Sequence, residues 1–149
     1  MRKFALVAGL IGLTFVACDD DDPADPGDDL VTLDATLTGA AEVPDPGDDN
    51  GSGTAEITLD DDDNEICWDI TVANITLPAT AAHIHTGAAG VPGGVLVTLS
   101  APGADGTAEG CTAADDDVVD DIIANPAGFY VNVHTTDFTG GAVRGQLSN

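Results

Sequence analysis

Apolar residues recur at every second position through most of the chain, and this spacing limits the fold more than any other feature. The pattern is clear at Leu33, Ala35 and Leu37, where Thr and Asp fill the alternate positions. Such alternation turns one face of a β-strand towards a core and leaves the other face polar. The spacing predicts strands within residues 32–39, 54–60, 65–72, 81–85, 93–100, 128–135 and 141–147.

Helical spacing interrupts this alternation once. In DDDVVDDIIANP (residues 115–126) pairs of Val and Ile recur at helical intervals, acidic residues precede them, and Pro126 follows. Acidic residues suit the start of a helix, and proline is common after its end. Seven strands and one short helix predict an all-β protein, an antiparallel β-sandwich or barrel of about seven strands. A chain of 149 residues suits a single domain.

The first eighteen residues have the layout of a secretory leader. Arg2 and Lys3 precede an apolar run over residues 4–17, which is short for a transmembrane helix. The run ends in FVAC, which resembles a bacterial lipobox with Phe15 where leucine is usual. We therefore predict a lipoprotein signal peptide over residues 1–18 and lipidation of Cys18. The alternative is an ordinary cleaved leader in which Cys18 is incidental.

An acidic segment, DDDDPADPGDD, follows over residues 19–29. Like charges mixed with Pro and Gly predict a solvated, extended tether. Loss of Arg2 and Lys3 with the leader takes the formal net charge from −24 to −26. Such a surface argues against nucleic acid as a partner. We expect an exported lipoprotein of the cell envelope, periplasmic or surface-exposed, that meets the membrane through the lipid on Cys18; otherwise the protein is secreted.

Two further cysteines, Cys67 and Cys111, remain after export into a compartment where thiols oxidise. The strand pattern puts Cys67 on the face opposite Trp68, and Cys111 is expected in a loop before the helix. A disulfide between them would tie that loop to the sheet. The competing use is a thiolate metal site, which needs a cysteine beside His83.

The three histidines are the candidate metal ligands. His83 and His85 are two apart and share one strand face, with Ile84 on the other. Residues two apart on a strand lie about 7 Å apart at the backbone, so both imidazoles can reach one ion. His134 completes a set of three if its strand is adjacent, and Arg144 also faces away from the core.

Imidazole chemistry favours copper or zinc at such a site, with copper as the working hypothesis, and three protein ligands leave a coordination position open. The alternative is ordinary hydrogen bonding. In that interpretation the histidines and Arg144 tie loops to strand ends, with Thr135, Thr136 or Asp137 as partners.

Other chemistry has little support in the sequence. No G-x-S-x-G motif, P-loop or dinucleotide-binding glycine pattern is present. The acidic stretches DPGDDNGSG and DDDDNE lack residues that an EF-hand loop requires, and we interpret both as turns.

Several longer motifs resemble one family. The segments LTGAAEVPDPGDDNGSGTAEITLD, ICWDITVANI, AAHIHTGAAGVPGGVLVTL and NPAGFYVNVHTTDFTGGAVRGQL are similar to the chordin-type (CHRD) domain. They place a domain over residues 30–147; Thr139 departs from the more usual proline. The resemblance implies a β-barrel or immunoglobulin-like domain with no settled biochemical activity. In animal chordin, where the domain is repeated, other modules are held responsible for growth-factor binding.

A fainter resemblance concerns the order of the polar residues. Copper-zinc superoxide dismutases carry an H-x-H pair, a later histidine and an arginine near the C-terminus, and His83, His85, His134 and Arg144 follow the same order. This resemblance implies a superoxide-dismutase-like barrel with copper on the histidines and Arg144 beside it, guiding an anion. The bridging histidine and the remaining zinc ligands have no counterpart, so we do not expect dismutase activity.

Three functions follow from the sequence. The first is a non-catalytic binding or structural module of the cell envelope, with no cofactor. The second is a copper-binding protein that uses His83, His85 and His134. The third, a redox enzyme using that copper, is the least favoured.

Overall fold

The computed structural model describes residues 30–149. The expected leader, the lipidation site Cys18 and the acidic tether lie outside the described residues. The elements are β1 (Val31–Thr38), η1 (Gly39–Ala41), β2 (Ser52–Asp60), β3 (Glu65–Ala73), β4 (Ala81–Thr86), β5 (Val95–Leu99), β6 (Thr107–Ala113), α1 (Asp116–Ala124), η2 (Pro126–Gly128), β7 (Phe129–His134) and β8 (Val143–Gln146).

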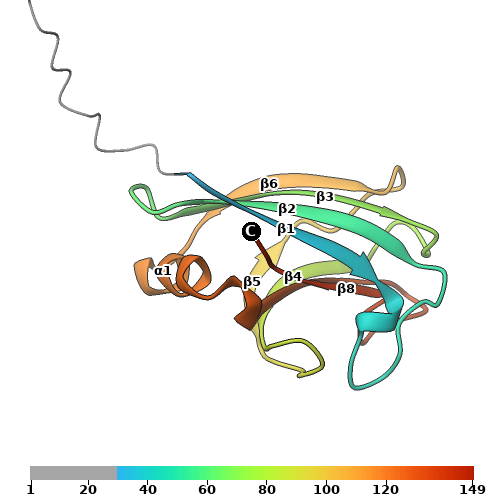
Figure 1. Ribbon diagram of the computed structural model, residues 1–149. Coiled ribbons are helices and arrows are strands. Elements are labelled where there is room, and N and C mark those ends of the chain that lie inside the picture. The colour runs from blue at the N-terminus through green and yellow to red at the C-terminus, as the bar shows by residue number, and fades with distance from the viewer. Residues whose placement is uncertain (1–29) are drawn as a thin grey trace, which may run out of the picture.

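Eight antiparallel strands form one sheet that curls into a nearly closed barrel. Their order is β5-β4-β7-β8-β1-β2-β3-β6. Figure 1 shows strands β1, β2, β3 and β6 stacked over β4, β5 and β8, with α1 at one end of the barrel. None of the helices within residues 30–149 is long and apolar enough to cross a membrane. The expected all-β antiparallel architecture with one short helix is confirmed.

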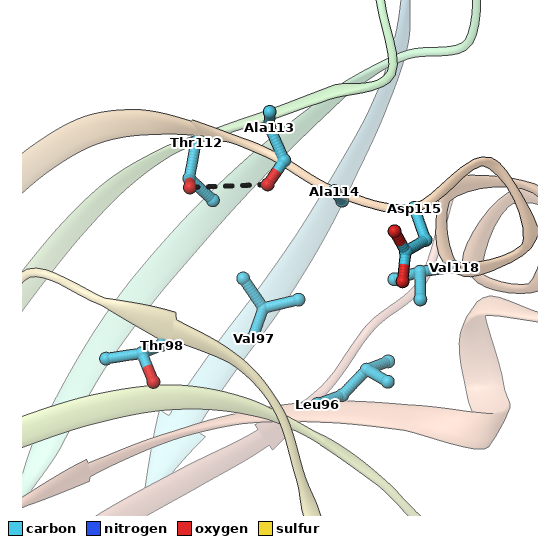
Figure 2. Close-up of a pocket in the computed structure, with 8 residues that line it drawn as sticks. All are labelled: Leu96, Val97, Thr98, Thr112, Ala113, Ala114, Asp115 and Val118. Carbon is cyan, nitrogen blue, oxygen red and sulfur yellow. Dashed lines mark hydrogen bonds between the residues drawn. The ribbon is translucent and has the colours of Figure 1, made fainter.

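The two outermost strands, β5 and β6, leave the barrel incompletely closed. Within residues 30–149 no strand pairing joins them. They converge at one end, where Trp68 Nε1 donates to Ser100 Oγ (2.9 Å) and Ser100 Oγ donates to the Glu109 carbonyl (3.0 Å). Towards α1 they diverge, and Figure 2 shows the open space that remains there.

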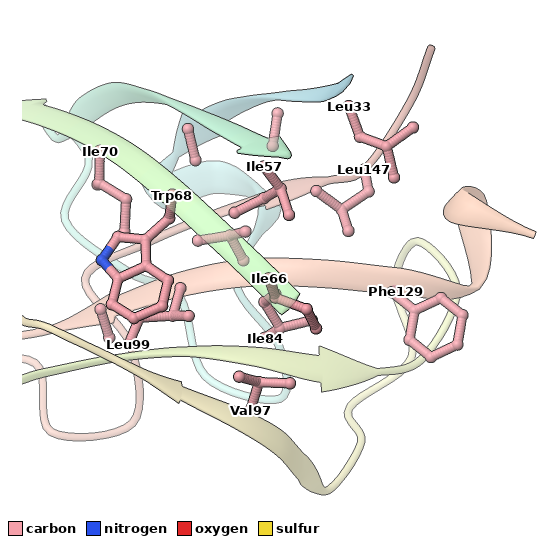
Figure 3. Packing of buried hydrophobic residues seen from close by; sticks show 14 of the residues in the cluster. Leu33, Ile57, Ile66, Trp68, Ile70, Ile84, Val97, Leu99, Phe129 and Leu147 are labelled. Carbon is pink, nitrogen blue, oxygen red and sulfur yellow. The ribbon is translucent and has the colours of Figure 1, made fainter. Parts of the chain in front are cut away.

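The inward-facing residues of all the strands but β6 build one apolar core inside the barrel (Figure 3). In β1, Leu33, Ala35 and Leu37 are buried and alternate with exposed residues, as the sequence pattern predicts. Helix α1 adds Val119 and Ile122, both fully buried. The remaining core residues are Ala55, Ile57, Leu59, Ile66, Trp68, Ile70, Val72, Ala82, Ile84, Val97, Leu99, Phe129, Val131, Val133, Val143 and Leu147.

One strand was not expected from the sequence. Residues 107–113, TAEGCTA, form β6, so the prediction that Cys111 lies in a loop is wrong. The stretch contains no large apolar residue and gives no alternating signal. It is a strand because it pairs along its whole length with β3, and Cys67 lies directly opposite Cys111 in that pairing.

The two cysteines form the expected disulfide. Their Cα atoms are 4.0 Å apart, and the bond joins residues 44 positions apart in the sequence. It holds edge strand β6 to β3, where the small side chains of β6 contribute little burial. The disulfide therefore supplies cohesion to the part of the sheet that the core stabilises least.

Replacing both cysteines, C67A together with C111A, should lower the free energy of unfolding by about 4 kcal/mol, because the unfolded chain regains the entropy of an open loop of this length. Chemical denaturation followed by circular dichroism measures the change. Reduction of the unaltered protein should give a loss of the same size. Equal stability of the variant and the oxidised protein would contradict this role.

Candidate metal centre

The outward side chains of β4, β7 and β8 lie in neighbouring rows on the barrel surface. His85 is paired with Tyr130, and Tyr130 with Gln146. In the next row Asn132 lies between His83 of β4 and Arg144 of β8. The pairing thus makes β4 and β7 adjacent, which is the condition for His134 to join the other two histidines.

The three histidines converge, because β4 and β7 are neighbours. His83 Nδ1 and His134 Nε2 are 3.1 Å apart, and one ring nitrogen from each histidine lies within 4.8 Å of the others. Two imidazole nitrogens that share a metal at 2.0–2.1 Å lie about 3 to 3.4 Å apart. The pair formed by His83 and His134 already has this spacing.

Backbone carbonyls fix the tautomers of two of the rings. His85 Nδ1 is 3.0 Å from the carbonyl of Gly93, and His134 Nδ1 is 3.0 Å from that of Thr139. A carbonyl only accepts, so both Nδ1 atoms donate, and in the neutral rings each Nε2 carries a lone pair. The His85 Nε2 is buried and has no hydrogen-bond partner. Metal-binding histidines commonly have this arrangement, in which the other ring nitrogen donates to a carbonyl.

The surroundings favour the neutral form of His83 and His134. Burial lowers the pKa of His83, and the charges that His134 and His85 would carry lower it further. Burial also lowers the pKa of His134, more than its hydrogen bond to Thr139 raises it. Both rings are therefore unprotonated near pH 7, the state in which imidazole binds a metal.

Arg144 lies beside the site but beneath a loop. Its side chain is 1% exposed, and its guanidinium carbon lies 3.4 Å from the centre of the Tyr130 ring. One terminal nitrogen donates to the carbonyls of Ala88 and Val91, both at 3.0 Å. The Tyr130 ring stacks in turn on His85, with centroids 4.9 Å apart. Arg144 thus positions the loop over residues 87–93, and its burial offers little support for the expected role in guiding an anion.

The outer face of β7 and β8 is more buried than the sequence predicts. Strands β7 and β8 were expected to have one wet face, yet Tyr130, Asn132 and Arg144 are all buried on it. The loop over residues 87–93 contacts Tyr130 and Arg144, and the buried Glu42 interacts with Asn132 and Arg144. Periodicity identifies the two faces of a strand, but it does not show which loops later cover the outer one.

Glu42 is a buried acid near this site that the sequence does not single out among 27 acidic residues. It is 6% exposed, and one of its carboxylate oxygens has no hydrogen-bond partner. Burial raises its pKa to about 7, although the Arg144 charge and hydrogen bonds from Val43 and Asn132 act in the opposite direction. Gly141 packs so closely that a Cβ there would lie 2.2 Å from the Glu42 carboxylate.

Comparison with known protein families agrees with this barrel and its motifs. The CHRD domain matches residues 33–147. The chain belongs to the CHRD domain family. Searches of curated proteins and of solved structures find no match. The CHRD match therefore identifies the domain family. The chemistry is inferred from the arrangement of the three histidines.

Glu42 should make the stability of this CHRD protein depend on pH. Its pKa in the folded state is about 7 against an ordinary 4.5, so folding favours the protonated acid. Its contribution is complete below about pH 4.5 and is lost as the pH rises through 7. Relative to E42Q, the protein should lose up to about 3 kcal/mol of unfolding free energy over this range.

Denaturant unfolding at several pH values measures this difference. E56Q is the matched control, because it removes a carboxylate that is exposed on β2. Its stability difference from the unaltered protein should change little with pH. Parallel pH profiles for E42Q and the unaltered protein would contradict the assignment to Glu42.

Proposed function

We propose that this CHRD protein is an exported, lipid-anchored protein of the cell envelope that binds one copper ion through His83, His85 and His134 and does not itself catalyse a reaction. One observation carries the proposal: the three imidazoles converge while two of them donate Nδ1–H to backbone carbonyls, which leaves the Nε2 lone pair of His85 without a partner and that of His134 with only His83 as its partner. The export and anchoring part rests on the leader and Cys18.

The chemistry of the ligands selects the metal. Calcium and magnesium prefer oxygen ligands, whereas neutral imidazole suits copper and zinc. Copper binds most nitrogen sites more tightly than zinc does. The cluster contains no carboxylate or thiolate, since Cys67 and Cys111 are bonded to each other.

We do not propose redox catalysis at this site. The sequence has three histidines in all, so none is left to bridge to a second metal as in copper-zinc superoxide dismutases. Arg144, which would attract an anion there, is covered by the loop that it holds. Storage or transfer of copper fits these features better than turnover of superoxide.

A binding or structural role is the second candidate. Without metal, the same histidine contacts simply tie loops to strands: His83 donates to His134, and the other two rings hold Gly93 and Thr139. The acidic surface argues against a nucleic-acid partner in either case. Metal binding decides between the two candidates.

Calorimetry with Cu²⁺ and Zn²⁺ tests the metal site. We expect one tight site in the unaltered protein and its loss in the variant H83A/H85A/H134A, with weak binding to the acidic surface in both. T98A is the matched control, because Thr98 is the exposed partner of His83 on β5. Circular dichroism shows that the variants are folded. Equal weak binding by all three proteins would leave only the structural role.

The affinity for metal should also resist mild acid. Three imidazoles with an ordinary pKa of about 6.5 would lose about sixfold in affinity between pH 7.5 and 6.5. Because the pKa values of His83 and His134 are lowered, we expect a smaller loss. Zn²⁺ titrations at the two pH values measure it, and a loss of sixfold or more would show that protons compete normally for these rings.

A further inference from the structure

The gap between β5 and β6 is a groove of about 470 Å³, and its β5 wall lies beside β4, the strand that carries His83 and His85. Figure 2 shows its walls: Leu96, Val97 and Thr98 on one side, and the end of β6 with the start of α1 on the other. Both strands are edges of the sheet, and edge strands present unpaired backbone groups to a further strand.

The pairing of β6 with β3 shows which backbone groups face this groove. Just beyond β6, Ala114 N donates to the carbonyl of Asn64 at 2.9 Å. Antiparallel partners alternate between hydrogen-bonded and non-bonded pairs. Thr112 therefore bonds to β3, whereas Cys111 and Ala113 direct their N–H and C=O groups away from it, towards the groove.

Two further contacts agree with this assignment of hydrogen-bonded and non-bonded pairs. The carbonyl of Glu109, two residues before Cys111, accepts a hydrogen bond from Ser100 across the closed end of the gap. The Cα atoms of Cys67 and Cys111 are 4.0 Å apart, near the value of about 4.5 Å for a non-bonded pair and well below about 5.5 Å for a bonded one.

The side chains also leave room for an apolar group. At the closed end the Trp68 ring fills the space beside Gly110, where a Cβ would lie 2.6 Å from a ring carbon. At the open end the β6 side contributes only Thr112, Ala113 and Ala114. Val97 and Val118 line the same space, so an inserted aliphatic side chain would contact apolar walls.

Charge restricts what can occupy the groove. Asp115 lines its open end, and Asp116 and Asp117 follow in the first turn of α1. The described residues include a single basic side chain, Arg144, which is buried elsewhere. A second copy of this chain would bring the same negative charge, whereas lysine or arginine beside the groove would be attracted.

We propose that the groove binds an extended segment of a partner protein, which pairs antiparallel with β6, inserts an aliphatic side chain between Val97 and Val118, and carries a basic residue next to the start of α1. Addition of a strand to a sheet edge is a common mode of peptide recognition. This proposal does not depend on the metal site.

A seven-residue peptide of alternating threonine and valine with a lysine at each end is the probe. Binding to the full chain is followed by the fluorescence of Trp68, the only tryptophan, which lies at the closed end of the gap. We expect saturable binding, and at least tenfold weaker binding of a peptide with glutamate at both ends. Absent binding, or equal binding of the two peptides, would overturn the proposal.

The variant A113P tests the contribution of the backbone. It removes an N–H that faces the groove and is not bonded to β3, and edge strands tolerate proline. We expect at least a tenfold loss of peptide affinity, whereas A113S, which keeps the N–H, should bind as the unaltered protein does. Undiminished binding by A113P, or the same loss in A113S, would overturn strand pairing at β6.

T112F provides a second test if A113P does not fold. The larger ring fills the open end of the groove and should abolish binding of the lysine peptide while circular dichroism stays native. Binding that persists in a folded T112F protein would place the peptide elsewhere. Sedimentation of the protein without peptide should show a monomer, and a dimer that T112F disrupts would assign the groove to a second copy instead.

Discussion

Burial of Arg144 organises the outer face of the barrel on which the histidines lie. A guanidinium is costly to remove from water unless its donors are paired. Here the carbonyls of Ala88 and Val91 accept from Nη2 and the planar group lies over the Tyr130 ring, whereas Nη1 is buried without a hydrogen-bond partner. The loop over residues 87–93 must therefore fold back onto β8, and that fold brings the Gly93 carbonyl to His85.

The loop over residues 87–93 also restrains His85. Tyr130 connects Arg144 to His85 through its ring and accepts a hydrogen bond from Gly93 N at its hydroxyl. His85 is consequently held on two sides, by stacking and by its Nδ1 bond, while its Nε2 has no partner. A buried nitrogen without a hydrogen-bond partner costs stability. Under the proposed function, a metal ion at this nitrogen would offset that cost.

Periodicity predicted what depends on the strands alone. It predicted the inward face and the position of Ile84 opposite the two histidines. It left the approach of His134 conditional on β7 lying beside β4, and the pairing of these strands meets that condition. It could not predict features made by contacts between distant loops, such as the burial of Arg144 and Glu42. It also missed β6, because a strand of Thr, Ala and Gly is specified by its partner β3 and by the disulfide, not by its own pattern.

The small side chains of β6 give no strand signal in the sequence, and they also leave the barrel open beside this strand. Larger residues at Ala113 and Ala114 would have given a clearer strand signal and a smaller gap against β5. Strand β5 lies between the groove and β4, which carries His83 and His85, and His134 lies on β7 at the other edge of β4. The proposed segment would pair with β6, on the side of the groove opposite Thr98, which is the β5 partner of His83. The two proposed sites therefore use different strands, β6 for a partner segment and β4 with β7 for a metal ion.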